Sequence, residues 1–87
     1  MFKNHQNSPL NQFVPRSREE RLALEIAKVL GDPDSLYHYI QICQKYPEKL
    51  IREILDEVLA VPACRIRKSR GALFTFLVKK RNHEIHT

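Results

Sequence analysis

Residues 47–60 read Pro47-Glu48-Lys49-Leu50-Ile51-Arg52-Glu53-Ile54-Leu55-Asp56-Glu57-Val58-Leu59-Ala60. Apolar residues recur in this stretch at the three- and four-residue spacing of one helix face, and charged residues fill the opposite face. Glu48 and Arg52 carry opposite charges four residues apart, which favours an ion pair along the helix. Pro62 follows the stretch and cannot continue a helix. The pattern therefore predicts an amphipathic helix around which a helical fold is built.

Two further helices are predicted before this stretch. Ser17-Arg18-Glu19-Glu20 has the form of a capping box, in which the Ser17 hydroxyl accepts from the Glu20 amide and the Glu20 carboxylate reaches back to the Ser17 amide. We expect this helix to end near residue 30, because Gly31 is a typical residue after a helix C-terminus. Asp32 as N-cap and Pro33 at the first helical position predict a second helix over about 33–45.

A fourth helix is predicted over about 70–81, with Ser69 as its cap. Its apolar residues cover a broad arc, and they are Leu73, Phe74, Phe76, Leu77 and Val78. A strand over 72–78 is the competing interpretation, since Phe and Val favour sheets. The chain shows no second strand to pair with it, which favours the helix.

Length and composition indicate one small globular domain. The chain has 87 residues, of which 43% are hydrophobic and only two are glycine. We expect an all-α fold, a small bundle of about four short helices. Residues 1–16 are predicted to be a flexible arm whose Phe13 and Val14 can dock on the domain, residues 17–81 the helical domain, and residues 82–87 a flexible tail.

Positive charge is concentrated in the last third of the chain. From residue 62 to 87 there are seven basic residues and one acid, whereas residues 17–61 hold six basic residues and nine acids. Clustered cations are what phosphate binding requires. The predicted nucleic-acid-binding residues are Arg65, Arg67, Lys68, Arg70, Lys79, Lys80 and Arg81. Base stacking is not indicated, because no aromatic residue lies within the clusters themselves.

The two basic clusters, residues 65–70 and residues 79–81, differ in how much they need an external anion. Cations at the end of a helix complement its dipole, so residues 79–81 are unremarkable alone. Cations near a helix start oppose the dipole, so residues 65–70 require either phosphates or internal acids such as Asp56 and Glu57. Both interpretations stay open at this level. If the first is right, Arg67→Glu with Arg70→Glu should weaken duplex DNA binding at least about tenfold.

A hypothesis of a different class is a protein–protein adaptor or a homodimer. A core this small often needs an oligomer, and the apolar arc of the last helix is wider than one packing face requires. The predicted interface residues are Phe74, Val78, Tyr37 and Ile42.

Residues 17–45 also have some features of a helix-turn-helix. Ala27, Gly31 and Ile40 match its small, turn and core positions. Asp32 and Asp34 would face phosphates in that arrangement and repel them. An antiparallel helical hairpin is the alternative.

The sequence offers no set of residues for catalysis, a cofactor or a metal. No serine lies in a G-x-S-x-G elbow, and neither Cys43 nor Cys64 is spaced from a histidine as a zinc ligand would be. We therefore expect a protein that is not an enzyme and binds no metal. Thiols without regular spacing and an N-terminus without an apolar run indicate the cytoplasm, although a Cys43–Cys64 bridge stays an alternative. No apolar run approaches the roughly 18 residues of a membrane span.

One resemblance covers residues 46–79. Tyr46 to Val58 form an amphipathic helix, and then a basic turn, the small pair Gly71-Ala72 and a short aromatic-aliphatic helix follow. This order resembles the helical module near the C-terminal end of some plasmid and phage replication initiators, and more loosely DnaD-type primosome proteins. The resemblance implies DNA transactions on a mobile element or in a bacterial cell, with the cations of residues 65–70 near the nucleic acid. Together these observations make a DNA-binding module the leading hypothesis.

Overall fold

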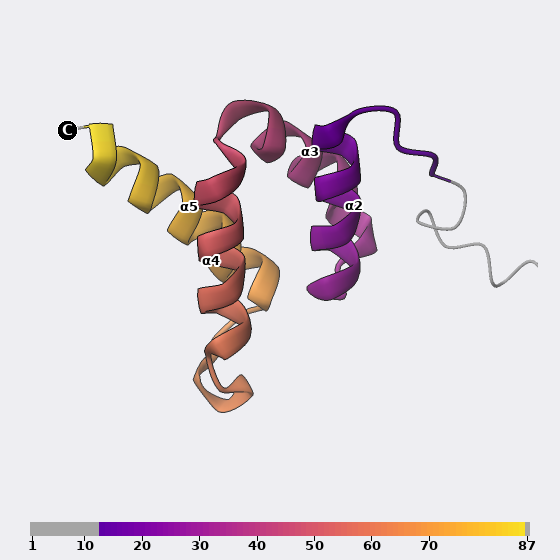
Figure 1. The fold of residues 1–87 in the computed structure, drawn as a ribbon. Helices are drawn as coiled ribbons and strands as arrows, with labels where there is room; N and C mark the ends of the chain where they lie inside the picture. Colours follow the sequence, from indigo (N-terminus) through magenta and orange to yellow (C-terminus); the bar gives the residue numbers. More distant parts are fainter. Residues whose placement is uncertain (1–12, 87) are drawn as a thin grey trace, which may run out of the picture. The chain divides into compact units, whose positions relative to one another are not determined.

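The computed structural model describes residues 13–86, which form helices joined by short turns and contain no β-strand (Figure 1). The elements are α2 (Arg18–Val29), η2 (Pro33–Ser35), α3 (Leu36–Lys45), α4 (Glu48–Ala60), η3 (Ala63–Arg65) and α5 (Arg70–His86), where η denotes a 3-10 helix. The predicted all-α class is confirmed, and the strand alternative for residues 72–78 is wrong because they lie within α5. Most of the predicted N-terminal arm falls outside the described residues, and residues 13–16 have no regular secondary structure.

The chain divides into two compact units. The first ends at Gln44 and contains α2, η2 and nearly all of α3, and the second begins at Lys45 and contains α4, η3 and α5. The predicted domain over residues 17–81 spans both units. The division falls just before Tyr46-Pro47, where the chain leaves the helical conformation between α3 and α4.

Helix α2 begins as predicted at Ser17, with one change in the capping contacts. The Ser17 hydroxyl accepts from the Glu20 amide at 3.1 Å. The Glu20 carboxylate accepts from the Arg16 amide at 2.8 Å, one residue earlier than the predicted Ser17 amide. The cap thus extends into the segment before the helix, where Arg16 would otherwise leave its amide to water.

Gly31 ends α2 in the predicted way. Its φ is 65°, in the left-handed region, and its amide donates to the Lys28 carbonyl at 3.2 Å. The Asp32 amide donates to the Ala27 carbonyl at 2.9 Å. These two bonds are the pair that defines a Schellman motif, which satisfies carbonyls at the end of the helix.

The helical segment predicted over about 33–45 is confirmed, with Pro33 at its first position, but its first turn is a 3-10 turn and Asp32 does not cap it through its side chain. The Asp32 side chain makes no capping hydrogen bond, residues Pro33–Ser35 form a 3-10 turn, and α3 begins at Leu36. The hydroxyl of Tyr39 instead donates to Asp32 Oδ2 at 2.8 Å. Burial, followed by the bond to Asp32 and its charge, raises the pKa of Tyr39 above its ordinary value.

In the second unit, α4 packs against α5. The apolar face of α4 is buried as predicted, and it consists of Leu50, Ile51, Ile54, Leu55 and Val58. On its exposed face, Arg52 Nε lies 2.8 Å from Glu48 Oε2, which confirms the predicted pair. Helix α5 buries Gly71, Phe74 and Val78, a set with three- and four-residue spacing.

Helix α5 is longer than predicted. It runs to His86, although the sequence pattern ends at residue 81 and the remaining residues were expected to form a flexible tail. Residues 82–86 contain neither glycine nor proline, so nothing in them stops the helix.

Candidate nucleic-acid interface

The connector between α4 and α5, residues 61–69, presents its basic side chains to solvent. It contains the single turn η3 and extended residues on both sides of it. Arg65, Arg67 and Lys68 are exposed, while Ile66 is half-buried. The Ser69 hydroxyl accepts from the Ala72 amide at 3.0 Å, which confirms the predicted cap and fixes where α5 begins.

Arg70 has a structural role instead of the predicted phosphate contact. Its Nη1 donates to the carbonyl oxygen of Val58 at 2.6 Å and to that of Val61 at 2.9 Å. These carbonyls lie at the C-terminal end of α4, where a positive charge is favoured by the helix dipole. The contact spans nine and twelve residues, so no local sequence spacing announces it.

Arg81 also has an internal partner. Its Nη2 lies 3.0 Å from Glu57 Oε1, and both side chains are partly exposed. The hydrogen bond and charge of Glu57 raise the pKa of Arg81. Of the two acids that the sequence offered as internal partners, Glu57 is thus engaged, and it pairs with the second basic cluster.

Five of the seven predicted cations stay available to solvent. They are Arg65, Arg67, Lys68, Lys79 and Lys80. Among the side chains that the structure describes, those of residues 13–84, no ion pair or side-chain hydrogen bond involves any of them. No acid occurs between residue 62 and residue 83, and the first acid after this segment is Glu84, four residues beyond Lys80 on α5.

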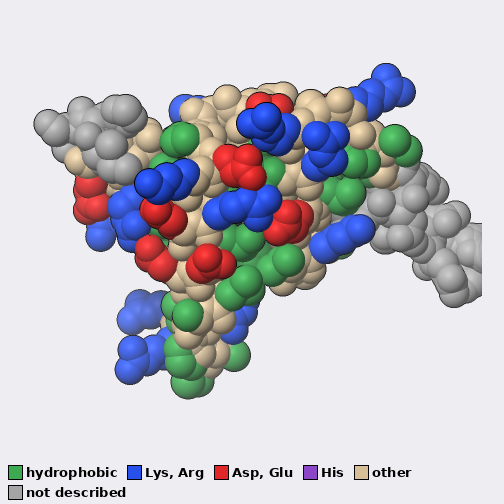
Figure 2. Space-filling view, viewed as in Figure 1, with side chains coloured by type: hydrophobic (Ala, Val, Ile, Leu, Met, Phe, Trp, Pro, Cys, Tyr) green, Lys and Arg blue, Asp and Glu red, His purple; other side chains and the backbone are tan. Residues whose placement is uncertain are grey.

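The connector and the start of α5 enclose a shallow groove of about 420 Å³. Its lining combines cations with apolar side chains, and the residues are Arg65, Ile66, Arg67, Lys68, Ser69, Ala72, Leu73 and Phe76. Figure 2 shows Lys and Arg side chains beside hydrophobic ones at the lower tip, where Figure 1 draws the connector. We call the groove together with Lys79 and Lys80 the basic groove surface.

Lys79 and Lys80 lie on the same side of α5 as the groove. At 100° per residue, both fall within about 60° of Phe76 around the helix axis, one turn further along. Both are exposed. The two predicted clusters therefore flank one aromatic side chain.

Phe76 is the member of this surface that sequence reasoning missed. Its side chain is 59% exposed, although Phe74 and Val78 of the same apolar arc, and not Phe76, were predicted to lie at the interface. The signal that could have identified Phe76 as exposed is its position on the helical wheel, about 160° from Phe74. Phe74 lies on the buried face of the helix. A broad apolar arc hides this difference until the packing of α5 on α4 is known.

Three of the four predicted interface residues lie in the interior. Phe74 and Val78 are completely buried and Ile42 is 4% exposed, so in the folded chain they are core residues. Phe74 and Val78 of the broad apolar arc of α5 are thus used inside the protein. Tyr37 is 73% exposed and is the one predicted interface residue at the surface.

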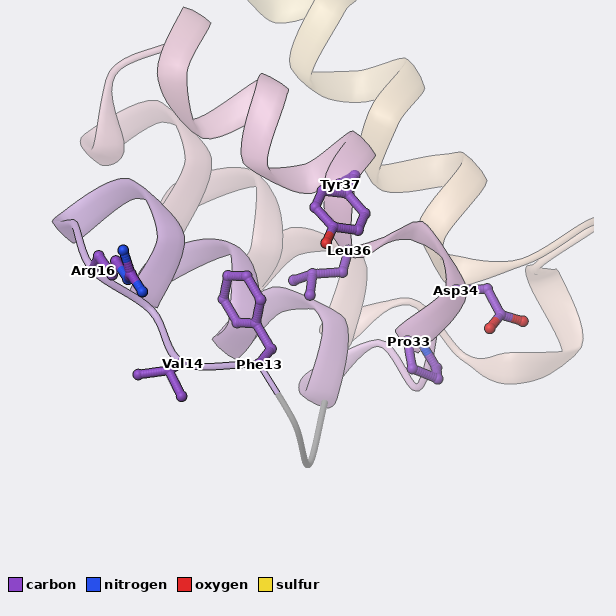
Figure 3. Close-up of a pocket in the computed structure, with 7 residues that line it drawn as sticks. All are labelled: Phe13, Val14, Arg16, Pro33, Asp34, Leu36 and Tyr37. Carbon is purple, nitrogen blue, oxygen red and sulfur yellow. The ribbon is translucent and has the colours of Figure 1, made fainter. Parts of the chain in front are cut away.

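Tyr37 borders a hollow of about 550 Å³ in the first unit (Figure 3). Phe13 is half-buried there and its ring points toward Leu36, whereas Val14 is 73% exposed. Of the two arm residues predicted to dock, only Phe13 does so. Asp34 lies exposed on the same rim, so a helix-turn-helix built on this unit would present a carboxylate to phosphates.

The described residues offer little for other chemistry. Among the described side chains, those of residues 13–84, no group of three or more His, Cys, Asp or Glu could hold a metal ion. Cys43 and Cys64 are both free thiols, the first buried and the second exposed. No helix in this part of the chain has the length and apolar character needed to cross a membrane.

Comparison with known proteins adds no relative. No protein-family model, curated protein or solved structure matches the chain.

Proposed function

We propose that this chain is a non-enzymatic nucleic-acid-binding module whose contact surface is the basic groove surface. The observation that carries the proposal is a set of five exposed cations without an ion pair in the described residues. Three of them line one groove, and Lys79 and Lys80 follow on the same side of α5, in a segment without acids from residue 62 to residue 83. Like charges gathered in this way repel one another, and an external polyanion relieves the repulsion.

Binding of this kind works through the phosphates. Each cation that neutralises a phosphate releases condensed counterions, so affinity falls steeply as salt rises. Arg65 and Arg67 can donate two parallel hydrogen bonds to one phosphate, and the lysines act as point charges. Contacts to the backbone carry no sequence information, so the module binds many sequences with similar affinity.

DNA is the nucleic acid that the sequence favours. The resemblance of residues 46–79 to modules of plasmid and phage replication initiators supports a role in replication or on a mobile element in bacteria. The two free thiols agree with a reducing, cytoplasmic setting.

The protein–protein alternative has less support than nucleic-acid binding at the surface that it named. It relied on the apolar face of the last helix, and the structure uses Phe74 and Val78 of that face in the core. Tyr37 alone does not make an interface, because an interface needs a contiguous buried patch.

The test is duplex DNA binding by charge-reversed variants, followed by fluorescence anisotropy. We expect Arg67→Glu with Lys68→Glu to weaken binding at least about tenfold at moderate salt. Arg18→Glu with Arg21→Glu, on the exposed side of α2, changes the net charge equally and is the matched control. Equal loss in both variants, or none in either, would contradict the proposal. Arg70→Glu is not a suitable variant, because Arg70 caps α4.

A further inference from the structure

The exposed ring of Phe76 is the feature that the proposed function leaves unexplained. Phe76 is 59% exposed, while Phe74 and Val78 on the same helix are completely buried. Four other large apolar side chains of residues 13–86 are well exposed, and they are Val14, Val29, Tyr37 and Leu59. None of these four belongs to the acid-free basic segment, so Phe76 alone combines an exposed aromatic face with surrounding cations.

Apolar side chains and cations both lie near the ring of Phe76, and a nucleotide needs both kinds of partner. Ile66, Ala72 and Leu73 line the groove beside it, which gives a base an apolar seat. Arg67 and Lys68 line the same groove, and Lys79 and Lys80 follow one helical turn beyond the ring. Phosphates on either side of a seated base would thus each meet a cation.

A single strand can use such a seat at no cost of unstacking, whereas a duplex must unstack a base step to receive the ring. In a duplex the faces of the bases are covered by their neighbours, and a flat phosphate surface would leave the ring of Phe76 without a partner. An unpaired base offers a π-face, which stacks on aromatic side chains whatever its sequence. We propose that the basic groove surface binds single-stranded nucleic acid in preference to duplex, with one base stacked on Phe76.

This inference rests on the proposed function and names its substrate class. Charge complementarity selects a polyanion, and the single aromatic ring seated among cations selects one with planar faces. A membrane surface fits less well, because insertion requires several exposed apolar side chains and this segment exposes one large one.

The experiment compares oligonucleotides of about 20 residues by fluorescence anisotropy: oligo-dT, oligo-U and a mixed-sequence duplex. We expect the single strands to bind more tightly than the duplex at equal salt. Phe76→Leu removes the π-face but keeps an apolar side chain, and it should weaken single-strand binding about tenfold while leaving duplex binding unchanged. Phe76→Tyr keeps the face and should bind as the unmodified protein does.

Two controls keep the result interpretable. Tyr37→Leu removes an exposed aromatic ring from the first unit and should not change binding. Circular dichroism should show the same helix content in every variant, since Phe76 is largely outside the core. Comparison of oligo-dT with oligo-U shows whether the protein prefers the DNA or the RNA strand, because the two share their phosphates and pyrimidine rings and differ in the 2′-hydroxyl and the C5-methyl group.

Two results would contradict the inference, and only the second would also contradict the proposed function. Equal binding of single strand and duplex, unchanged by Phe76→Leu, would remove base stacking and leave the proposed phosphate binding intact. Binding to none of the three oligonucleotides, with or without binding to phosphatidylserine vesicles, would remove both.

Discussion

The Nη1 atom of Arg70 lies 2.6 Å from the carbonyl oxygen of Val58, so the first residue of α5 caps the end of α4. The same nitrogen donates to the Val61 carbonyl at 2.9 Å. One positive charge thus contacts two carbonyls at the end of α4, of which that of Val58 also accepts from the Val61 amide at 3.2 Å, and it ties together the two ends of the connector.

Replacement of Arg70 should destabilise the protein. We expect Arg70→Ala to lower the free energy of unfolding by about 1–3 kcal/mol, because a half-buried charged donor is lost and the carbonyls of Val58 and Val61 lose it. Arg67→Ala, which removes an exposed side chain of the same kind, should change it by no more than about 0.5 kcal/mol. Urea unfolding followed by circular dichroism measures both.

The nucleic-acid affinities of these two variants should show the opposite order. Under conditions where both are folded, Arg67→Ala should weaken DNA binding more than Arg70→Ala does. If Arg70→Ala were as stable as the unmodified chain, the capping role would be wrong.

Gly31 is predicted to resist substitution for a backbone reason alone. Its φ of 65° is disfavoured for side chains, yet a Cβ atom built there would meet nothing within 4 Å. We expect Gly31→Ala to cost about 1–2 kcal/mol of stability, and Gly31→Asn to cost less because Asn tolerates the left-handed region. Thermal unfolding of the two variants compares them, and an Ala variant as stable as Gly would rule out this conformation.

The Tyr39–Asp32 hydrogen bond predicts a loss of stability at alkaline pH. The folded chain raises the pKa of Tyr39, so the unfolded chain ionises this phenol first, near pH 10. Its contribution to stability is therefore complete below about pH 10 and is lost as the pH rises above that value. Near neutral pH, Tyr39→Phe should cost about 1.5–3 kcal/mol, the usual net value of a hydrogen bond to a charged group.

Unfolding measured from about pH 9 to about pH 11 distinguishes this effect from general alkaline denaturation. The stability of Tyr39→Phe should fall less with pH than that of the unmodified chain. Tyr37→Phe is the matched control, since Tyr37 is 73% exposed, and it should leave the slope unchanged. Parallel pH profiles for the unmodified chain and Tyr39→Phe would contradict the prediction.

The two thiols should differ in reactivity. Cys64 is exposed in η3, whereas Cys43 is 6% exposed in α3. A thiol reagent should modify Cys64 promptly in the folded protein and reach Cys43 only on unfolding. Mass spectrometry after brief labelling identifies the modified residue, and rapid double labelling without denaturant would contradict the burial of Cys43.

Cys64 also reports on the proposed surface, because it directly precedes Arg65. Bound oligonucleotide should slow its labelling. Labelling unaffected by saturating DNA would place the bound strand away from the connector.

The parts of the fold that depend on local chemistry could be predicted from the sequence. The period of α4, the Ser69 cap and the stop at Gly31 each depend on residues within a few positions of one another. Asp32 failed as a cap because a hydroxyl seven residues away, on Tyr39, takes its carboxylate. Local propensity cannot anticipate such a tertiary partner.

The candidate site could likewise be predicted only in the part that depends on local sequence. The charge count located the basic segment, but Arg70 and Arg81 are engaged by atoms 9 to 24 residues away. Phe76 belongs to the site only because α5 turns Phe74 toward the core. A wide apolar arc shows that a helix is buried on one side without showing which residues face outward.

The most direct test of the central claim is the salt dependence of duplex DNA binding, measured as the slope of log affinity against log salt concentration. If all five exposed cations neutralise phosphates, the slope should approach about −4.5, and Arg67→Gln with Lys68→Gln should make it shallower by about 2. A slope near zero, or one that the double substitution leaves unchanged while Arg18→Gln with Arg21→Gln alters it, would show that the basic groove surface does not hold the nucleic acid.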